Sequence, residues 1–249
     1  MYLADMTSPA VNALDRNIPV VIPIAALEQH GQHLPVFTDS LLLGEVVRRA
    51  ALTASALFVP LQWLGNSHHH IDYPGTVSAP PRLYLNLLRE LAENFLIHGF
   101  KRLLFLNGHG GNIIPAKQAI FELRQKYRGR DDLLLLSASY WDLAQPHQEK
   151  DGYVQTNMGH ACEWETSMIL SLKPELVVGD AKTLETVSNS YGFDPAYRGW
   201  ITNERTPTGH IGSPQFATAE KGEHLFASFS GGVVRFIEKM QGWGGRGWD

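Results

Sequence analysis

An apolar run, Val20-Val21-Ile22-Pro23-Ile24-Ala25-Ala26-Leu27, leads directly into the polar residues Glu28-Gln29-His30. The run has the length and composition of a buried strand, and open α/β sheets bind their ligands at the carboxyl ends of such strands. Glu28 and His30 therefore lie where a sheet would present them to a ligand. Carboxylate and imidazole donors together suit Zn, Mn or Fe, whereas Ca and Mg prefer oxygen donors alone.

Asp39 ends the same polar stretch and has two interpretations. The segment Ser40–Leu52 is expected to be a helix, so Asp39 could cap its N-terminus. Asp39 could instead be a metal ligand that joins Glu28 and His30. This stretch alone does not decide between a helix cap and a metal site.

The bulk properties favour one large domain over residues 1–249. The net charge of −4 and the lack of any Lys or Arg run argue against nucleic acid and anionic membranes as partners. No apolar run approaches the ~18 residues of a membrane span, and no signal peptide is indicated. The single cysteine, Cys162, excludes an intrachain disulfide and fits a cytoplasmic protein. We expect Cys162 to be a small buried thiol rather than a nucleophile.

Strand-like runs alternate with amphipathic helix-like segments. Strands are expected at Val20–Leu27, Leu57–Leu61, Leu103–Asn107 and Leu133–Ser139. Helices are expected at Ser40–Leu52, Pro81–His98, Ile113–Tyr127, Gly159–Leu172 and Ala219–Met240. This alternation predicts a single-domain, three-layer α/β/α sandwich with a mainly parallel sheet.

Two long segments, 65–79 and 183–217, are rich in Gly, Pro, Asn, His and Thr and fit neither pattern. Irregular segments of this length are usually lids or subunit contacts, or they are disordered. The first contains the triplet His68-His69-His70. This triplet could be an exposed loop, which the composition favours, or one of its rings could line a pocket.

A second polar cluster, Asn107-Gly108-His109-Gly110-Gly111-Asn112, follows the third expected strand. Its glycines allow the backbone to approach a ligand closely. A phosphate site is the alternative, but the cluster lacks the Lys and the Ser or Thr of a P-loop. Metal binding by His109 is the favoured interpretation.

A third cluster contains His160 and Glu163, which would share one face of the helix expected at Gly159–Leu172. Glu165 would point away from that face. The alternative is a solvated helix start, where glutamates are favoured by the helix dipole. All three clusters fall where a parallel sheet has its carboxyl edge, which favours one composite metal site.

These motifs identify a resemblance to the creatininase (creatinine amidohydrolase) family over nearly the whole chain. The matching elements are Ala26–Gly31 with Leu34-Pro35 and Asp39, Tyr73–Thr76, Asn107–Asn112, Ser139–Asp142, His160–Ser167 and Ala219–Glu223. The resemblance implies a compact α/β sandwich with a binuclear metal centre, usually assembled as a hexamer.

The resemblance also implies roles for individual residues. Glu28 and His109 would bind one metal ion, His30 would bind the other, and Asp39 would bridge both. The cofactors would be two divalent ions, with Zn, Mn and Fe as candidates.

One ligand of the family is missing. Creatininase has a glutamate two residues after the histidine of Asn-Gly-His, and Gly111 occupies that position here. We expect Glu163 to supply the missing carboxylate. Glu165 would then contact the ligands without binding metal itself, or lie at the helix end, although the two assignments could be exchanged. His160 matches a histidine of the family that binds no metal and would be the catalytic proton shuttle.

The implied activity is hydrolysis of a C–N bond in a small-molecule amide, lactam or formamide by a metal-bridged hydroxide. Creatinine itself is not expected, because creatininase holds its substrate against a tryptophan where this chain has Thr156, beside Asn157. Residues expected to contact the substrate are Thr76, Gly110, Thr156, Asn157 and His70.

Two other functions remain as alternatives. A metal-dependent phosphoesterase would need basic residues near the site, and none of the three clusters contains Lys or Arg. A metal-binding family member without catalysis is the other alternative, and the presence of His160 argues against it.

Overall fold

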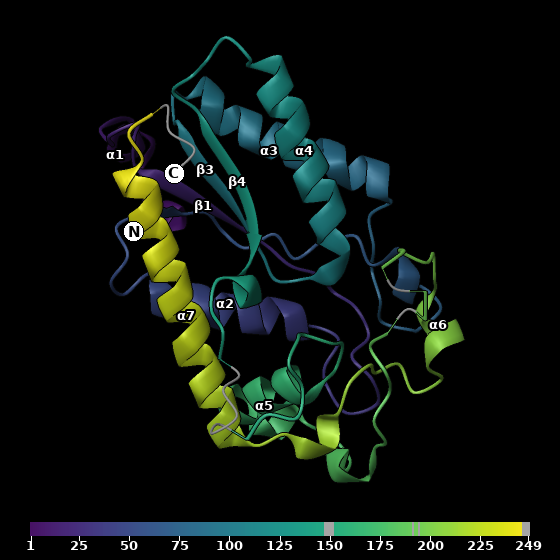
Figure 1. Ribbon diagram of the computed structural model, residues 1–249. Helices are drawn as coiled ribbons and strands as arrows, with labels where there is room; N and C mark the ends of the chain where they lie inside the picture. The colour runs from purple at the N-terminus through teal and green to yellow at the C-terminus, as the bar shows by residue number, and fades with distance from the viewer. Residues whose placement is uncertain (147–151, 191, 194, 246–249) are drawn as a thin grey trace.

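Four parallel strands form the centre of this computed structural model, which describes residues 1–146, 152–190, 192–193 and 195–245. The strands are β1 (Pro19–Ile24), β2 (Leu57–Phe58), β3 (Arg102–Asn107) and β4 (Leu134–Ser139), in the order β2-β1-β3-β4 (Figure 1). In register, Ile24 of β1 pairs with Asn107 of β3, and Asn107 pairs with Ser139 of β4. The polar segments that follow β1 and β3 therefore start at the same edge of the sheet.

Helices cover both faces of the sheet (Figure 1). One face packs on α3 (Pro81–Ile97) and α4 (Ile113–Lys126); the other packs on α2 (Thr38–Ala50), α5 (Glu163–Leu172) and α7 (Ala219–Gly242). Successive strand residues point to opposite faces of the sheet. Val20 and Ile22 therefore belong to the core beneath α3 and α4, and Val21 belongs to the core beneath α2, α5 and α7. The predicted α/β fold, with a parallel sheet between two helical layers, is confirmed. A short helix, α1 (Ser8–Asn12), precedes β1.

The start of α5 differs from the sequence-based expectation. The helix begins at Glu163 instead of Gly159, because His160 makes a β-bridge to Ile211, with N–O distances of 2.8 and 2.7 Å. Ala161 then turns the chain with a positive φ of 47°, which is uncommon for a residue with a side chain. His160 therefore lies outside the helix and does not share a helical face with Glu163.

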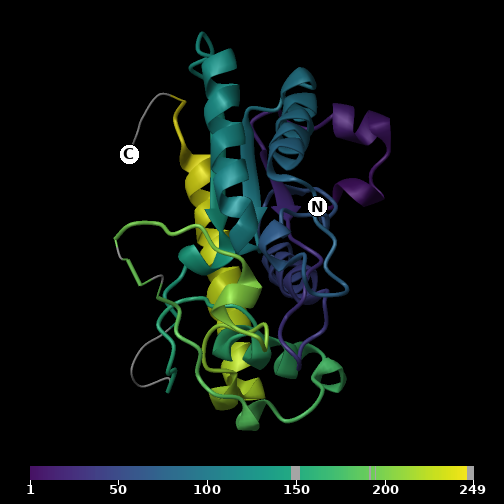
Figure 2. The same cartoon turned by 90° about the vertical axis from the view of Figure 1, so that its right-hand side faces the viewer.

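The two irregular segments meet beyond the carboxyl ends of the strands (Figures 1 and 2). Residues 183–217 contain α6 (Thr202–Arg205), which lies against the 3-10 helix His68–His70 of the other segment. The Tyr73 hydroxyl donates a hydrogen bond to the carbonyl oxygen of Thr206 at 2.7 Å. These contacts bring α6 close to the residues that follow β1.

No helix in the described part of the chain is both long and apolar enough to span a bilayer.

Candidate metal centre

Five side chains from the three sequence clusters converge at the carboxyl edge of the sheet. We call them the acid–histidine cluster: Glu28, His30, Asp39, His109 and Glu165. All five are buried, and His30 has an exposed fraction of 0%. A buried group of three carboxylates and two imidazoles is electrostatically costly unless protons or metal ions compensate for its negative charge.

The ring of His30 is oriented by the backbone beside it. Its Nδ1 lies 3.1 Å from the carbonyl oxygen of Glu28, so the Nδ1–H group donates there. The other nitrogen, Nε2, is then directed at Asp39 Oδ1, at 3.2 Å, and at Glu165 Oε1, at 3.5 Å. This arrangement leaves the Nε2 lone pair facing two carboxylates, as in a metal ligand.

His109 is oriented in a similar way by the loop after β3. Its Nε2 lies 3.0 Å from the carbonyl oxygen of Asn66, which leaves Nδ1 facing Asp39 Oδ2 at 2.9 Å and Glu28 Oε1 at 3.2 Å. Asn107 fixes the loop, because its side chain accepts from the His109 N–H at 3.0 Å and donates to the His109 carbonyl at 2.8 Å. Asp39 therefore lies between the two histidines.

Three buried atoms of the cluster lack a hydrogen-bond partner within the described part of the chain: Glu28 Oε2, His30 Nε2 and Asp39 Oδ2. All three are acceptors when the histidines are neutral, and a cation among them would satisfy them together. Among the residues that the structure describes, potential ligand atoms lie within 4.8 Å of one another in three groups, which are Glu28/His69/His109, His30/Asp39/Glu165 and Glu28/His30/His160. The residues therefore fit a metal centre with mixed nitrogen and oxygen donors.

The electrostatics of the cluster point in the same direction. Burial lowers the pKa of His109, but the charges of Glu28 and Asp39 outweigh burial and raise this pKa well above its usual value. Burial raises the pKa of Asp39, yet His30 and His109 bring it down to about 2. The site therefore attracts positive charge, and a divalent ion that binds there would displace the histidine protons.

Glu163, the predicted fifth metal ligand, uses both of its carboxylate oxygens in contacts outside the acid–histidine cluster. Glu163 Oε2 accepts from the N–H groups of Val154 and Gln155 at 2.9 and 2.8 Å. Glu163 Oε1 accepts from Lys221 Nζ at 2.6 Å. Glu163 thus fixes the segment before α5 to α7, and Glu165 is the carboxylate of this helix that faces His30.

His160 lies at the edge of the cluster, and its side chain is 12% exposed. Its Nε2 is 2.8 Å from the carbonyl oxygen of Gln29, and its Nδ1 is 3.5 Å from Glu28 Oε1. Burial, followed by the charges of His70 and His30, lowers the pKa of His160 well below its usual value. A neutral His160 that donates through Nε2 keeps Nδ1 free to take up a proton beside Glu28.

The triplet of histidines is divided between surface and site. His68 is exposed, so the exposed-loop interpretation holds for it, but His70 is buried. His70 Nδ1 lies 2.8 Å from both Gln29 Nε2 and Thr202 Oγ1, and its Nε2 lies 3.6 Å from Glu28 Oε2. The ring of His69 stacks on that of His109, with centroids 5.9 Å apart. The sequence pattern did not single out His69, because its placement depends on contacts with distant segments.

The other residues expected to contact substrate lie outside the acid–histidine cluster. Thr76 Oγ1 accepts from the Gln29 N–H at 3.1 Å, which supports the turn that carries Glu28 and His30. Gly110 is exposed. Thr156 and Asn157 are also exposed, and the Asn157 amide donates to Thr156 Oγ1 at 3.3 Å.

Cys162 is fully buried at the N-terminus of α5. Burial, together with the nearby charge of Glu165, raises the pKa of its thiol to about 12. A thiol with so high a pKa is not a nucleophile at neutral pH, which agrees with the expectation of a small buried side chain.

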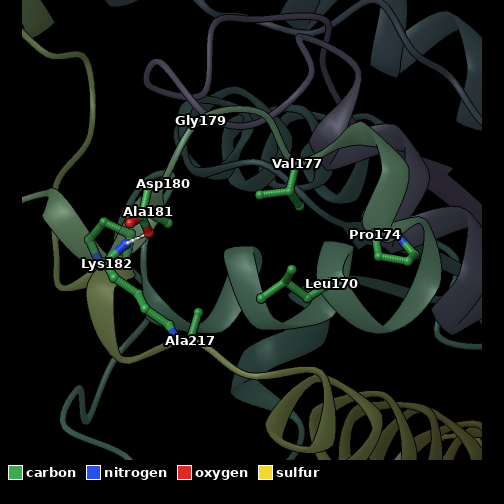
Figure 3. A pocket seen from close by; sticks show the side chains of 9 residues that line it. Leu170, Pro174, Val177, Gly179, Asp180, Ala181, Lys182 and Ala217 are labelled. Carbon is green, nitrogen blue, oxygen red and sulfur yellow. Dashed lines mark hydrogen bonds between the residues drawn. The ribbon is translucent and has the colours of Figure 1, made fainter.

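A separate cavity of about 220 Å³ lies beside α5 (Figure 3). Leu170 and Val177 line it with apolar side chains, and the Asp180 side chain accepts from the Lys182 N–H at 3.0 Å. Its lining includes no member of the acid–histidine cluster. We therefore place the candidate functional site at the cluster, where the unsatisfied buried acceptors are, and not at this cavity.

Comparison with known proteins shows the family to which the chain belongs. A family profile described as creatininase, creatinine amidohydrolase, matches residues 4–237. The mycofactocin precursor peptide peptidase of Mycolicibacterium smegmatis is 30% identical over 228 residues, which is 89% of this chain and 85% of that protein. Creatinine amidohydrolase of Pseudomonas putida is 30% identical over 237 residues, which is 88% of each protein.

The solved structures agree with the sequence matches. A crystal structure of creatinine amidohydrolase (creatininase) superposes with a TM-score of 0.82 at 26% identity, and the match covers 97% of this chain and 98% of that one. The family profile spans nearly the whole sequence, and the structural match covers 97% of the chain. This chain belongs to the creatininase family.

Proposed function

We propose that this protein is a binuclear metal-dependent amidohydrolase that cleaves a C–N bond in a small molecule. The observation that carries the proposal is the position of Asp39, whose two oxygens face His30 and His109 in a buried site with unsatisfied acceptors. Glu28 and His109 would hold one ion, His30 and Glu165 would hold the other, and Asp39 would bridge them. This set replaces the predicted Glu163 with Glu165.

The donor set and the relatives support Zn, Mn or Fe as the metal ions. Solved creatininase structures at 26% and 25% identity include a manganese form and a mutant zinc–zinc form. Both metals accept mixed imidazole and carboxylate donors, and iron does as well. When bound, such ions lower the pKa of water to ~7 and polarise a carbonyl oxygen.

The protein's own groups would then control binding and proton transfer. His160 Nδ1, which lies beside Glu28, would take up a proton and deliver it to the leaving nitrogen. The carbonyl oxygen and the side-chain amide of Gln29 lie 2.8 and 2.9 Å from Nε2, the opposite ring nitrogen, and so orient the ring with Nδ1 toward Glu28. Burial of the cluster limits the access of bulk water to the reacting groups.

The substrate class rests on the family and on the residues around the site. Two relatives, a creatinine amidohydrolase and a peptide peptidase, both act on C–N bonds, and an amide, lactam or formamide substrate would fit that chemistry. Thr156 and Asn157 are exposed and provide no aromatic wall of the kind that the family resemblance implies for creatinine. We also propose a cytoplasmic homohexamer that acts on a small molecule rather than on nucleic acid or a membrane.

A substrate panel tests the proposed activity. The purified protein, reconstituted separately with Zn, Mn and Fe, is assayed against linear amides, lactams, formamides, creatinine and phosphate monoesters. We expect turnover of at least one amide class and little or no turnover of creatinine. Turnover of phosphate esters alone would favour a phosphoesterase, and a metal-loaded protein inactive on the whole panel would favour a non-catalytic role.

The two neighbouring glutamates of α5 provide a matched pair of variants. Glu165→Gln is expected to lose one metal ion per chain and to fold normally, because its carboxylate faces His30. Glu163→Gln is expected to retain both ions but to lose about 3 kcal/mol of unfolding free energy, because it removes one partner of a buried ion pair. Elemental analysis and urea denaturation measure the two effects, and an exchange of the two outcomes would restore Glu163 as the ligand.

A further inference from the structure

We propose that His69 is an additional ligand of the metal ion held by Glu28 and His109. The inference rests on the metal centre proposed above and adds a residue that the family resemblance does not supply. Ligand atoms of Glu28, His69 and His109 lie within 4.8 Å of one another, a spacing that one ion can bridge. His69 is half-buried, and its ring is nearly parallel to that of His109, with an interplanar angle of 16°.

The backbone at Gly111 explains why a ligand would come from this direction. A Cβ atom at position 111 would lie 2.0 Å from the Asn66 carbonyl oxygen and 2.5 Å from His109 Nε2. It would also lie 3.0 Å from Cε1 of His69. The place that a side chain at position 111 would enter is therefore filled by Asn66 and by the edge of the His69 ring.

The His69 ring is held in place by its neighbours. Trp200 meets it edge to face, with ring centroids 4.9 Å apart and an interplanar angle of 73°. The ring of His70 lies 4.2 Å away on the same 3-10 helix, and Thr202 of α6 contacts His70 Nδ1 at 2.8 Å. An imidazole fixed in this way loses little conformational freedom when it binds a metal ion, which favours its use as a ligand.

The proposal makes the two metal positions chemically unequal. One ion would have the imidazoles of His69 and His109 together with carboxylate oxygen. The other would have a single imidazole, that of His30, with the carboxylates of Asp39 and Glu165. Because imidazole suits zinc and oxygen donors suit manganese, the position at His69 should favour zinc more strongly than the position at His30.

Metal titration of ring-conserving variants tests this proposal. His69→Phe keeps an aromatic ring against Trp200 and removes the donor nitrogens, and His68→Phe makes the same change at the exposed neighbour. Each full-length protein is stripped of metal and titrated with zinc against a chromophoric chelator. Cobalt(II) absorption spectra are recorded in parallel, because they report the ligands directly. Far-UV circular dichroism confirms that each variant is folded.

For wild type and His68→Phe, we expect two zinc ions per chain with the same affinities. For His69→Phe, we expect one of the two zinc affinities to fall by at least about tenfold. Loss of a residue that only hydrogen-bonds to a metal ligand already lowers metal affinity by about 10- to 100-fold, and loss of a ligand should cost no less. The cobalt spectrum should change only in His69→Phe. Identical isotherms and spectra for all three proteins would overturn the proposal.

A measurement on the wild-type protein covers the case in which His69→Phe does not fold. X-ray absorption of the protein loaded with two zinc ions should report three imidazole ligands per pair of ions, and a count of two would overturn the role of His69. The same measurements distinguish a failure of the proposed function from a failure of the proposed role of His69. A wild type that binds no zinc would overturn both proposals, whereas two bound ions with an unaltered His69→Phe would overturn this one alone.

Discussion

Asp39→Asn is expected to leave the protein folded but with at most one metal ion per chain and almost no activity. The substitution keeps the shape of the side chain and removes the charge that faces both His30 and His109. Removal of a single electrostatic contact in an active site costs roughly 10²–10³-fold in turnover. Because Asp39 would hold both ions, the expected loss in kcat/KM is at least ~10³-fold.

Asp72→Asn is the matched control for this experiment. Asp72 is exposed, and the substitution makes the same chemical change outside the cluster. Elemental analysis and an assay on the best amide substrate should give Asp72→Asn the same metal content and turnover as the wild type. An Asp39→Asn protein that kept both ions and full turnover would show that Asp39 is not a metal ligand. The alternative interpretation of Asp39 as the helix cap does not hold, because α2 begins at Thr38 with Phe37 at its N-cap and Asp39 lies in the first turn.

His160→Asn is expected to separate metal binding from catalysis. The variant should retain both ions, because the proposed ligands lie elsewhere, and its kcat should fall by about 10²–10⁴-fold, the usual contribution of a general acid or base. Burial lowers the pKa of His160, so its ring is neutral, and its Nδ1 faces Glu28 Oε1 at 3.5 Å. The measurements are steady-state kinetics and elemental analysis of the same preparation.

His224→Asn serves as the control, because His224 forms a surface contact with the Tyr153 hydroxyl at 3.0 Å. It should behave like the wild type in both measurements. If His160→Asn loses a metal ion, His160 is a ligand of the group that also contains Glu28 and His30. If it retains both the ions and the wild-type kcat, the shuttle role is wrong.

Local patterns were sufficient to predict the layers of this fold. The apolar run that begins at Val20 is a buried strand, and the regular alternation of strands and helices produced the parallel sheet. The carboxyl-edge rule then brought Glu28, His30 and His109 together correctly, because parallel strands end at one edge. Each of these inferences depends only on short-range sequence and on general topology.

The details in which the structure differs from the sequence-based expectation depend on long-range contacts. The spacing of His160 and Glu163 suggested one helical face, but a β-bridge to Ile211 pulls His160 out of the helix. Lys221, far along the chain, then takes the Glu163 carboxylate, so Glu165 is the one that reaches the cluster. No local pattern contains the position of either distant partner.

His69 and His70 illustrate the same difficulty. A polar loop of three histidines is typical of an exposed segment, and only the packing of α6 shows otherwise. Thr202 holds His70, and Trp200 meets the edge of His69. Both partners are more than a hundred residues away in sequence, so a single sequence gives no periodicity that links them.

The metal content of the purified wild-type protein, measured by elemental analysis beside Glu28→Gln and His109→Ala, tests the binuclear centre most directly. We expect two divalent ions per chain in the wild type and at most one in either variant, because Glu28 and His109 face each other at 3.2 Å and would share one ion. A wild type with one ion or none, and with the same content in both variants, would contradict the binuclear centre.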